Sequence, residues 1–524
     1  MRDLFKPKWR FAHIPSRHAA IFSIASAVLF TALPPAVPPA HAQPRLPTLG
    51  DGLELTAAAE RKLGDRIIRE LYRDPDYLED AVLQEYVQGI FQPLLSAARA
   101  RGEVAPDIDE RFAWEILLGR DRSVNAFALP GGYFGLHLGL IGVVATPDEL
   151  ASVLAHELSH VTQRHISRLI AQQGKQTPLM IGALILGALA ASKSPDAAQA
   201  LMVGGQALAV QNQLNFSREM EREADRVGYG LMQPAGFAPQ GFVAMFDKLQ
   251  QANRLNDNGS WPYLRSHPLT TQRIADMQSR IAHGAAPAAP APLQHALLAA
   301  RARVLSRPGT DALRQWLAQP QDAGFAARGQ RERAAAWYAA ALSAVQLSDW
   351  QAARAAVRGL QDAVAGDANA ARQARLLAAE VELAAGAPQA ALKLLPESAG
   401  GASTHRPELL LRAQALVAGA GTAADRQALA GTLQTWVTAR PRDAAAWQAL
   451  AQLWRAQGQG LRALRAEAEA QVARQDYAAA VDRFKAGQDL ARKSAGAADY
   501  IEASIIDTRL RAVESLLREQ AAER

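Results

Sequence analysis

Residues 146–160 read TPDELASVLAHELSH, and this stretch decides the fold and the chemistry expected around it. It predicts one helix, because Thr146 can serve as the N-cap and Glu149 can complete a capping box. Pro147 follows the cap, where its missing N–H costs nothing. Apolar residues at helical spacing come next and can pack into a core. The polar residues at the end of this helix therefore need a different explanation.

His156 and His160 lie four residues apart, so a helix places them one above the other on a single face. Two imidazoles in that arrangement can hold one tetrahedral metal ion. Glu157 is adjacent to the first histidine and can address a water at the metal instead of binding the metal. Zinc lowers the pKa of such a water to about 7, and a carboxylate can then take its proton. The pattern predicts zinc-dependent peptide-bond hydrolysis with Glu157 as the general base.

A second run, SREMEREAD at residues 217–225, offers carboxylates at helical spacing and can complete the metal site. Glu221 and Asp225 share one face, four residues apart. One of them can bind the metal while the other accepts the N–H of a ligating histidine and fixes its tautomer. Spacing alone leaves Glu219, Glu221 and Glu223 open as the third ligand.

Four segments, in order, resemble metallopeptidase family 48, a family of gluzincin zinc peptidases. The family includes membrane prenyl-protein peptidases and bacterial periplasmic proteases. The resemblance extends over about residues 124–273 and rests on VNAFALPGG at 124–132, HELSH at 156–160, EREAD at 221–225 and SHP at 266–268. It implies one zinc ion per chain held by His156, His160 and Glu221. It also implies that Asp225 stands behind a ligating histidine.

The resemblance gives the first of these segments a role in substrate binding. Family members bind substrate as an added strand beside the zinc, and an exposed strand edge can pair with any extended peptide. The candidate residues are Asn125, Ala126, Phe127, Ala128 and Leu129. The alternative is a hairpin with a purely structural role.

The same resemblance implies that His267 lies close to the zinc, where it either assists catalysis or binds the metal and holds the enzyme inactive. It implies that Arg273 helps to stabilise the tetrahedral oxyanion. The alternative for this segment is a surface turn before a helix. His165 and His137 have no carboxylate pattern around them, so we expect both to be ordinary polar surface or core residues.

The N-terminal segment indicates the cellular compartment, and the composition excludes some kinds of catalytic chemistry. The 524-residue chain contains no cysteine, which excludes cysteine nucleophiles, cysteine metal ligands and thiol redox chemistry. A formal charge of +6 without blocks of Lys/Arg interleaved with aromatics gives little support to nucleic-acid binding. A basic stretch, an apolar run at 19–33 and AHA at 40–42 predict a signal peptide cleaved after Ala42. The alternative, an uncleaved anchor, is disfavoured by prolines at 34–39.

Composition predicts three further regions after a signal peptide at 1–42. They are a zinc metallopeptidase domain at 43–285, an Ala/Pro linker at 286–297 and an α-helical tetratricopeptide-like repeat domain at 298–524. The repeat assignment rests on WQALAQLWRAQG at 447–458, and the alternative is an unrepeated Ala-rich bundle. Within the peptidase region we expect helices at 57–72 and 78–98 and a hairpin of strands 123–129 and 133–138. Apolar runs at 178–191 and 197–210 are read as a cover over the cleft or an interfacial contact, or else as buried core.

The expected fold is thus mainly α, with a small β-hairpin or sheet in a gluzincin domain followed by helical repeats. The order of signal, peptidase and repeats resembles periplasmic proteases of this family. It implies an endopeptidase that degrades misassembled outer-membrane proteins, with chaperone-like assistance to β-barrel assembly. The implied partners are those substrates and the barrel-assembly machinery, with at most peripheral membrane contact. The alternative is a repeat-based scaffold whose proteolysis is normally switched off.

Overall fold

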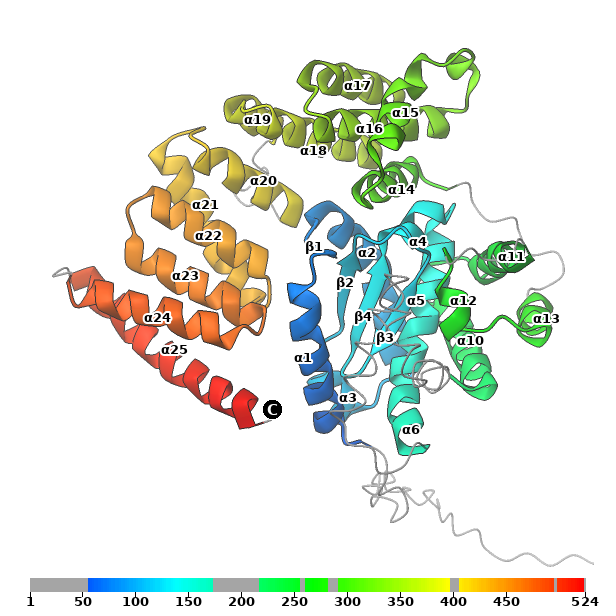
Figure 1. Ribbon diagram of the computed structural model, residues 1–524, viewed down its shortest axis with the longest axis horizontal. Coiled ribbons are helices and arrows are strands. Elements are labelled where there is room, and N and C mark those ends of the chain that lie inside the picture. Colours follow the sequence, from blue (N-terminus) through cyan, green and yellow to red (C-terminus); the bar gives the residue numbers. More distant parts are fainter. Residues whose placement is uncertain are drawn as a thin grey trace, which may run out of the picture. The chain divides into compact units, whose positions relative to one another are not determined.

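The computed structural model describes residues 55–172, 216–254, 260–280, 291–395, 405–493 and 497–522. These residues are mainly helical and contain one four-stranded sheet (Figure 1), as predicted. The strands are β1 (Tyr77–Leu78), β2 (Glu115–Gly119), β3 (Ala126–Leu129) and β4 (Tyr133–His137). The first helices of the peptidase region are α1 (Ala57–Arg73), α2 (Ala81–Ala100), α3 (Pro106–Arg111) and α4 (Leu138–Val143).

The strand order is β1-β2-β4-β3, with β2 and β4 parallel and the other pairs antiparallel. β3 and β4 form the predicted hairpin, in which Ala126 faces Leu136 and Leu129 faces Tyr133. Gly131 and Gly132 both have φ near +76°, a conformation that glycine adopts without a steric penalty. Among the described strands β3 pairs only with β4, so it forms one edge of the sheet.

Alternate residues of the strands serve two different cores. Ile116 and Leu118 of β2 join α2 and the helix α5 (Pro147–Thr162) in one hydrophobic cluster. Leu117, which lies between them, packs with Leu63 and Ile67 of α1. This alternation is the two-residue period of a strand, and it places α1 on one face of the sheet and α2 with α5 on the other.

The helix that carries the histidines begins as the sequence predicts, with one difference. The Thr146 hydroxyl accepts a hydrogen bond from the backbone N–H of Glu149 at 3.1 Å, and Pro147 is the first helical residue. The Glu149 carboxylate, however, bonds the N–H of Ala145 at 2.8 Å instead of that of Thr146, so the expected reciprocal capping box is replaced by a bond one residue earlier. The same carboxylate oxygen, Oε2, lies 3.6 Å from Nζ of Lys248.

Helix α10 (Arg218–Met232) packs directly across α5. The closest approach is at Gly228, where an added Cβ would lie 3.0 Å from the carbonyl carbon of Ala155 and 3.1 Å from the nitrogen of His156. A glycine is therefore what allows the two helices to approach so closely. Between α5 and α10 in the sequence lies α6 (His165–Gln172). After α10 come α11 (Gln240–Arg254), α12 (Tyr263–Ser266) and α13 (Thr271–Arg280).

The remaining described chain is built from helices, several of which pack as successive pairs. α14 (Leu293–Leu305) begins inside the range predicted for the linker and packs against α4. The later helices are α15 (Thr310–Ala318), α16 (Gln330–Gln346), α17 (Trp350–Ala363), α18 (Ala368–Ala384), α19 (Pro388–Leu394), α20 (Arg406–Val417), α21 (Ala423–Ala439), α22 (Ala444–Ala456), α23 (Gly460–Ala473), α24 (Tyr477–Ala491) and α25 (Ala497–Ala522). Short 3-10 turns lie at Gln319–Gln321 and Phe325–Ala327.

Leu298, Ala302 and Leu376 belong to the same hydrophobic cluster as α2 and α5, so the helical region and the peptidase region share part of one core. The domain limits and the repeat interpretation stay predictions. The predicted signal peptide and the apolar runs at 178–191 and 197–210 lie outside the described residues. No helix in the described part of the chain combines the length and apolar character needed to cross a bilayer.

Candidate metal centre

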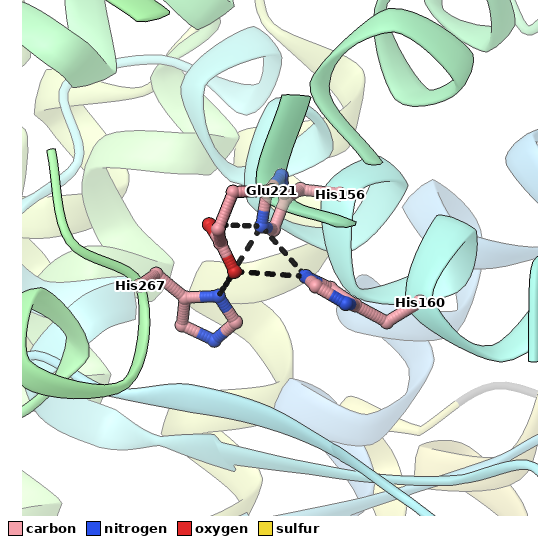
Figure 2. Close-up of side chains that lie close together, drawn as sticks. All are labelled: His156, His160, Glu221 and His267. Carbon is pink, nitrogen blue, oxygen red and sulfur yellow. Dashed lines mark hydrogen bonds and ion pairs between the residues drawn. The ribbon is translucent and has the colours of Figure 1, made fainter. Parts of the chain in front are cut away.

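Four side chains from two helices and the end of a third converge on one point (Figure 2). His156 and His160 come from α5, Glu221 from the first turn of α10, and His267 from the residue that ends α12. Each offers one nitrogen or oxygen, and these four atoms lie within 4.8 Å of one another. None of the four residues is more than 2% exposed. The predicted ligands are therefore together, with His267 beside them.

The facing atoms are all possible metal ligands. Nε2 of His156 and Nε2 of His160 are 3.0 Å apart. The Glu221 oxygens lie 3.4 Å from each of these nitrogens. A neutral imidazole nitrogen and a carboxylate oxygen are standard zinc ligands, and three such groups with one further position are the set found at catalytic zinc sites. The donor set at this point fits zinc.

Glu157 supports the same conclusion from the neighbouring position on α5. Its side chain is 1% exposed, and neither carboxylate oxygen has a hydrogen-bond partner within the described residues. Oε1 lies 3.4 Å from Nε2 of His267. Burying a carboxylate without compensation is costly, and a divalent cation beside it would offset that cost. Glu157 lies beside the four residues that could hold a metal without being one of them.

Asp225 lies behind His156, as predicted. Its Oδ1 is 3.0 Å from Nδ1 of His156. Burial alone would lower the pKa of His156, but the bonds to Asp225 and Glu221 outweigh it and raise the pKa to about 9. Burial would raise the pKa of Asp225, yet Arg273 and His156 together hold it below its usual value. Asp225 is therefore a carboxylate that can accept the Nδ1 proton and leave Nε2 free for a metal.

Arg273 contacts the carboxylates of Asp225 and Glu221. Its Nε and Nη2 donate to the two oxygens of Asp225 at 2.6 and 2.8 Å. Its Nη1 donates to the carbonyl of Pro268 at 2.9 Å and lies 2.7 Å from Oε2 of Glu221. The side chain is 3% exposed. These contacts hold the guanidinium against Glu221, a candidate ligand, and against Asp225, which lies behind His156. The expected contact with substrate stays a prediction.

His267 is held by an aromatic neighbour and two acids. Its ring stacks on Tyr263, with centroids 4.5 Å apart and planes at 28°. Nδ1 lies 3.0 Å from Oε1 of Glu221 and 3.3 Å from Nε2 of His156. The alternative of a surface turn is wrong, because His267 is 2% exposed. Its two expected roles, assisting catalysis or acting as a resting ligand, stay predictions.

His165 is a core residue, one of the two outcomes expected for it, but a carboxylate that the sequence pattern did not indicate lies beside it. His165 is completely buried, and its Nδ1 lies 2.9 Å from Nδ1 of His160. Its Nε2 lies 3.0 Å from Oε2 of Glu223, a carboxylate 58 residues away in sequence that local pattern reading did not connect to it. Burial lowers the pKa of His165 to about 4, so the ring is neutral at neutral pH. His137, in contrast, is buried in the sheet and bonds the hydroxyl of Ser123 at 2.9 Å.

The predicted substrate strand is connected to the segment that leads to His267. Val124, which precedes β3, donates to the carbonyl of Ser260 at 2.8 Å, and its own carbonyl accepts from Tyr263 at 3.3 Å. β3 also packs against α5. Asn125 is buried, with Oδ1 lacking a hydrogen-bond partner in the described structure, whereas Phe127 is half-buried. The predicted strand therefore lies beside the candidate site, and its contact with substrate stays a prediction.

Comparisons with known proteins agree with this geometry. Residues 83–281 match the model of peptidase family M48. The beta-barrel assembly-enhancing protease of Escherichia coli is 30% identical over 331 residues, which is 62% of this chain and 64% of that protein. A Vibrio cholerae protein given the same name provisionally is 36% identical over 286 residues, 53% of this chain and 56% of its own length. The mitochondrial metalloendopeptidase OMA1 of Saccharomyces cerevisiae is 28% identical over 198 residues, 36% of this chain and 54% of its own. The matched part of the chain thus covers between half and two thirds of the length of each of these relatives.

Proposed function

We propose that this chain, whose residues 83–281 match the model of peptidase family M48, is a zinc-dependent endopeptidase of that family. The observation that carries the proposal is the convergence of His156, His160 and Glu221, with an unbonded, buried Glu157 beside them. When bound, zinc would supply a Lewis acid that polarises the scissile carbonyl and makes a water nucleophilic near neutral pH.

The residues of this chain divide the remaining work. Glu157 takes the proton of the attacking water and delivers it to the leaving amine, because its carboxylate faces the ligand group from the next position on α5. Asp225 holds the proton of His156 on Nδ1. Arg273 holds Asp225 in place by charge-assisted hydrogen bonds and Glu221 by an ion pair. The edge strand β3 receives an extended peptide beside the site.

His267 is proposed as a gate. Its ring lies within 3.4 Å of atoms of His156, Glu157 and Glu221, so it can enter the ligand set or turn toward the substrate. As a ligand it would occupy the fourth position and keep water out. Turned away, it would stand next to developing negative charge, where a histidine can donate a hydrogen bond.

The biological setting follows from the relatives and from the N-terminus. Two of the relatives are named beta-barrel assembly-enhancing proteases. We propose that this chain is exported to the periplasm by a signal peptide cleaved after Ala42, and that it degrades misassembled outer-membrane proteins. Helices in the range 298–524 would act as tetratricopeptide-like repeats that bind the barrel-assembly machinery. The second candidate, a scaffold with proteolysis switched off, is favoured by the position of His267 among the ligands.

The test uses three full-length proteins: the wild type, Glu157→Gln and the control Glu219→Gln, whose carboxylate lies on the exposed face of α10. Zinc content is measured by elemental analysis, and cleavage is followed with an unfolded outer-membrane protein. We expect one zinc ion per chain in all three, and a rate lower by about 10²–10⁴-fold in Glu157→Gln alone. A wild-type protein that contains no zinc would refute the proposal. If cells with Glu157→Gln handle outer-membrane proteins normally, the scaffold is the main function.

A further inference from the structure

A tight turn directs the side chain of His165 back toward the metal centre. α5 ends at Thr162, and Arg164 has φ +56° in the turn before α6 begins. A non-glycine residue in that left-handed region costs about 1 kcal/mol or more, so surrounding contacts must hold it there. The guanidinium of Arg164 makes those contacts with Glu60 at 2.9 Å and with Ser167 at 3.2 Å. The turn therefore fixes His165 at the start of α6.

From that position His165 connects a candidate ligand to a charged pair. Its Nδ1 lies 2.9 Å from Nδ1 of His160. Its Nε2 lies 3.0 Å from Oε2 of Glu223, and the same oxygen accepts from Nη1 of Arg168 at 2.8 Å. The chain of contacts runs from α5 through α6 to α10. His160 is buried, and the ring of Phe216 stacks on it with centroids 3.9 Å apart.

The chemistry of two facing imidazole nitrogens determines where the protons lie. Nε2 of His160 faces the ligand group, and a nitrogen that binds a metal carries no proton. The proton of a neutral His160 must then be on Nδ1, so this atom donates to Nδ1 of His165. His165 accepts there and keeps its own proton on Nε2, which donates to Glu223. The opposite arrangement would place a proton on the metal-binding nitrogen of His160.

We propose that His165 is a positioning residue that holds His160 in the tautomer able to bind the metal, with Glu223 fixing the tautomer of His165 in turn. The inference rests on the proposed metal site and assigns a second support to it. His156 has Asp225 behind it, and His160 has a histidine–carboxylate pair in the corresponding place. Partners of this kind orient the ring of a ligand, and their loss reduces metal affinity by about 10–100-fold.

Two substitutions separate this role from simple packing. In His165→Asn the side-chain oxygen takes the place of Nδ1, so it can still accept from His160 but no longer reaches Glu223. In His165→Gln the amide extends to the place of Nε2, so the contact with Glu223 can persist while the acceptor facing His160 is lost. Both variants replace a fully buried ring with a smaller polar side chain and should lose packing to a similar extent.

The experiment measures zinc affinity of the full-length proteins by competition with a chelator, together with the thermal unfolding midpoint of the zinc-free forms. We expect His165→Asn to stay within about threefold of the wild type and His165→Gln to bind zinc about 10–100-fold more weakly, with similar midpoints for the two zinc-free variants. Equal affinities of the two variants, whether both normal or both weakened, would overturn the inference. A wild-type protein that binds no zinc would instead refute the proposed metal site.

Discussion

Replacing Arg301 with methionine is expected to destabilise the protein strongly, because this guanidinium joins the peptidase region to the helices that follow it. Arg301 is 5% exposed and lies on α14. It donates to both oxygens of Asp80, with the shortest contact 2.6 Å, and to both oxygens of Glu380 at 2.8 Å. It also contacts the hydroxyl of Tyr338 at 3.1 Å. Asp80 in turn caps α2 through the N–H of Leu83.

The magnitude follows from what the substitution leaves behind. Two carboxylates, with side chains 9% and 20% exposed, would face each other without a cation. Removing one partner of a buried ion pair costs about 3–5 kcal/mol, and the partial exposure of Glu380 favours the lower end of that range. A loss of about 3 kcal/mol corresponds to roughly a hundredfold shift in the unfolding equilibrium.

The assay is urea unfolding followed by circular dichroism at neutral pH. The dependence of the unfolding free energy on urea concentration is compared between the proteins, because an equal slope means that only stability has changed. The control is Arg314→Met, whose ion pair with Asp311 is exposed and worth at most about 1 kcal/mol. The triple variant Arg301→Met/Asp80→Asn/Glu380→Gln removes all three charges and keeps a good N-cap, so it should recover much of the loss. The reasoning is refuted if Arg301→Met matches the control, or if the triple variant is no more stable than Arg301→Met.

Two further predictions concern the crossing of α5 with α10 and the acid sensitivity of the later helices. Gly228→Ala should cost about 1–3 kcal/mol and weaken zinc binding, because its Cβ would meet the backbone of Ala155; unchanged zinc affinity in a chelator titration would contradict this. Burial would raise the pKa of Asp443, but Arg406 and Trp436 outweigh it and lower the pKa. Its stabilising contribution is therefore present above the unfolded-state pKa of about 4 and is lost as pH falls through the folded-state value. In Asp443→Asn, the free energy of unfolding should therefore fall less steeply with decreasing pH than in the wild type. An equally steep fall in both proteins would contradict this prediction.

The histidine pair could be predicted because its spacing is local, whereas the choice of Glu221 among three nearby glutamates rested on the family resemblance. His156 and His160 are one turn apart on a helix whose cap and apolar face are written in the same 15 residues, and Asp225 is one turn from Glu221. A helix repeats every 3.6 residues, so such pairs are on one face whatever the rest of the chain does. The hairpin is local in the same way, since two glycines between two β-rich runs allow little else.

The surroundings of those ligands could not be predicted, because they depend on contacts between distant segments. His165 meets Glu223 across 58 residues, and Arg273 reaches Asp225 across 48. No periodicity in the sequence connects such pairs, so the carboxylate partners of His165 and Arg273 could not be predicted from it.

The sequence by itself thus determined where the histidine helix begins and which of its faces carries candidate metal ligands, because helical spacing and capping are properties of neighbouring residues. Only the tertiary structure decided that His165 and Glu223 stand behind His160 and how Arg301 joins α2 to α14 and α18. These depend on burial, which brings charges from separate helices within hydrogen-bond distance and makes an unpaired group too costly to leave there.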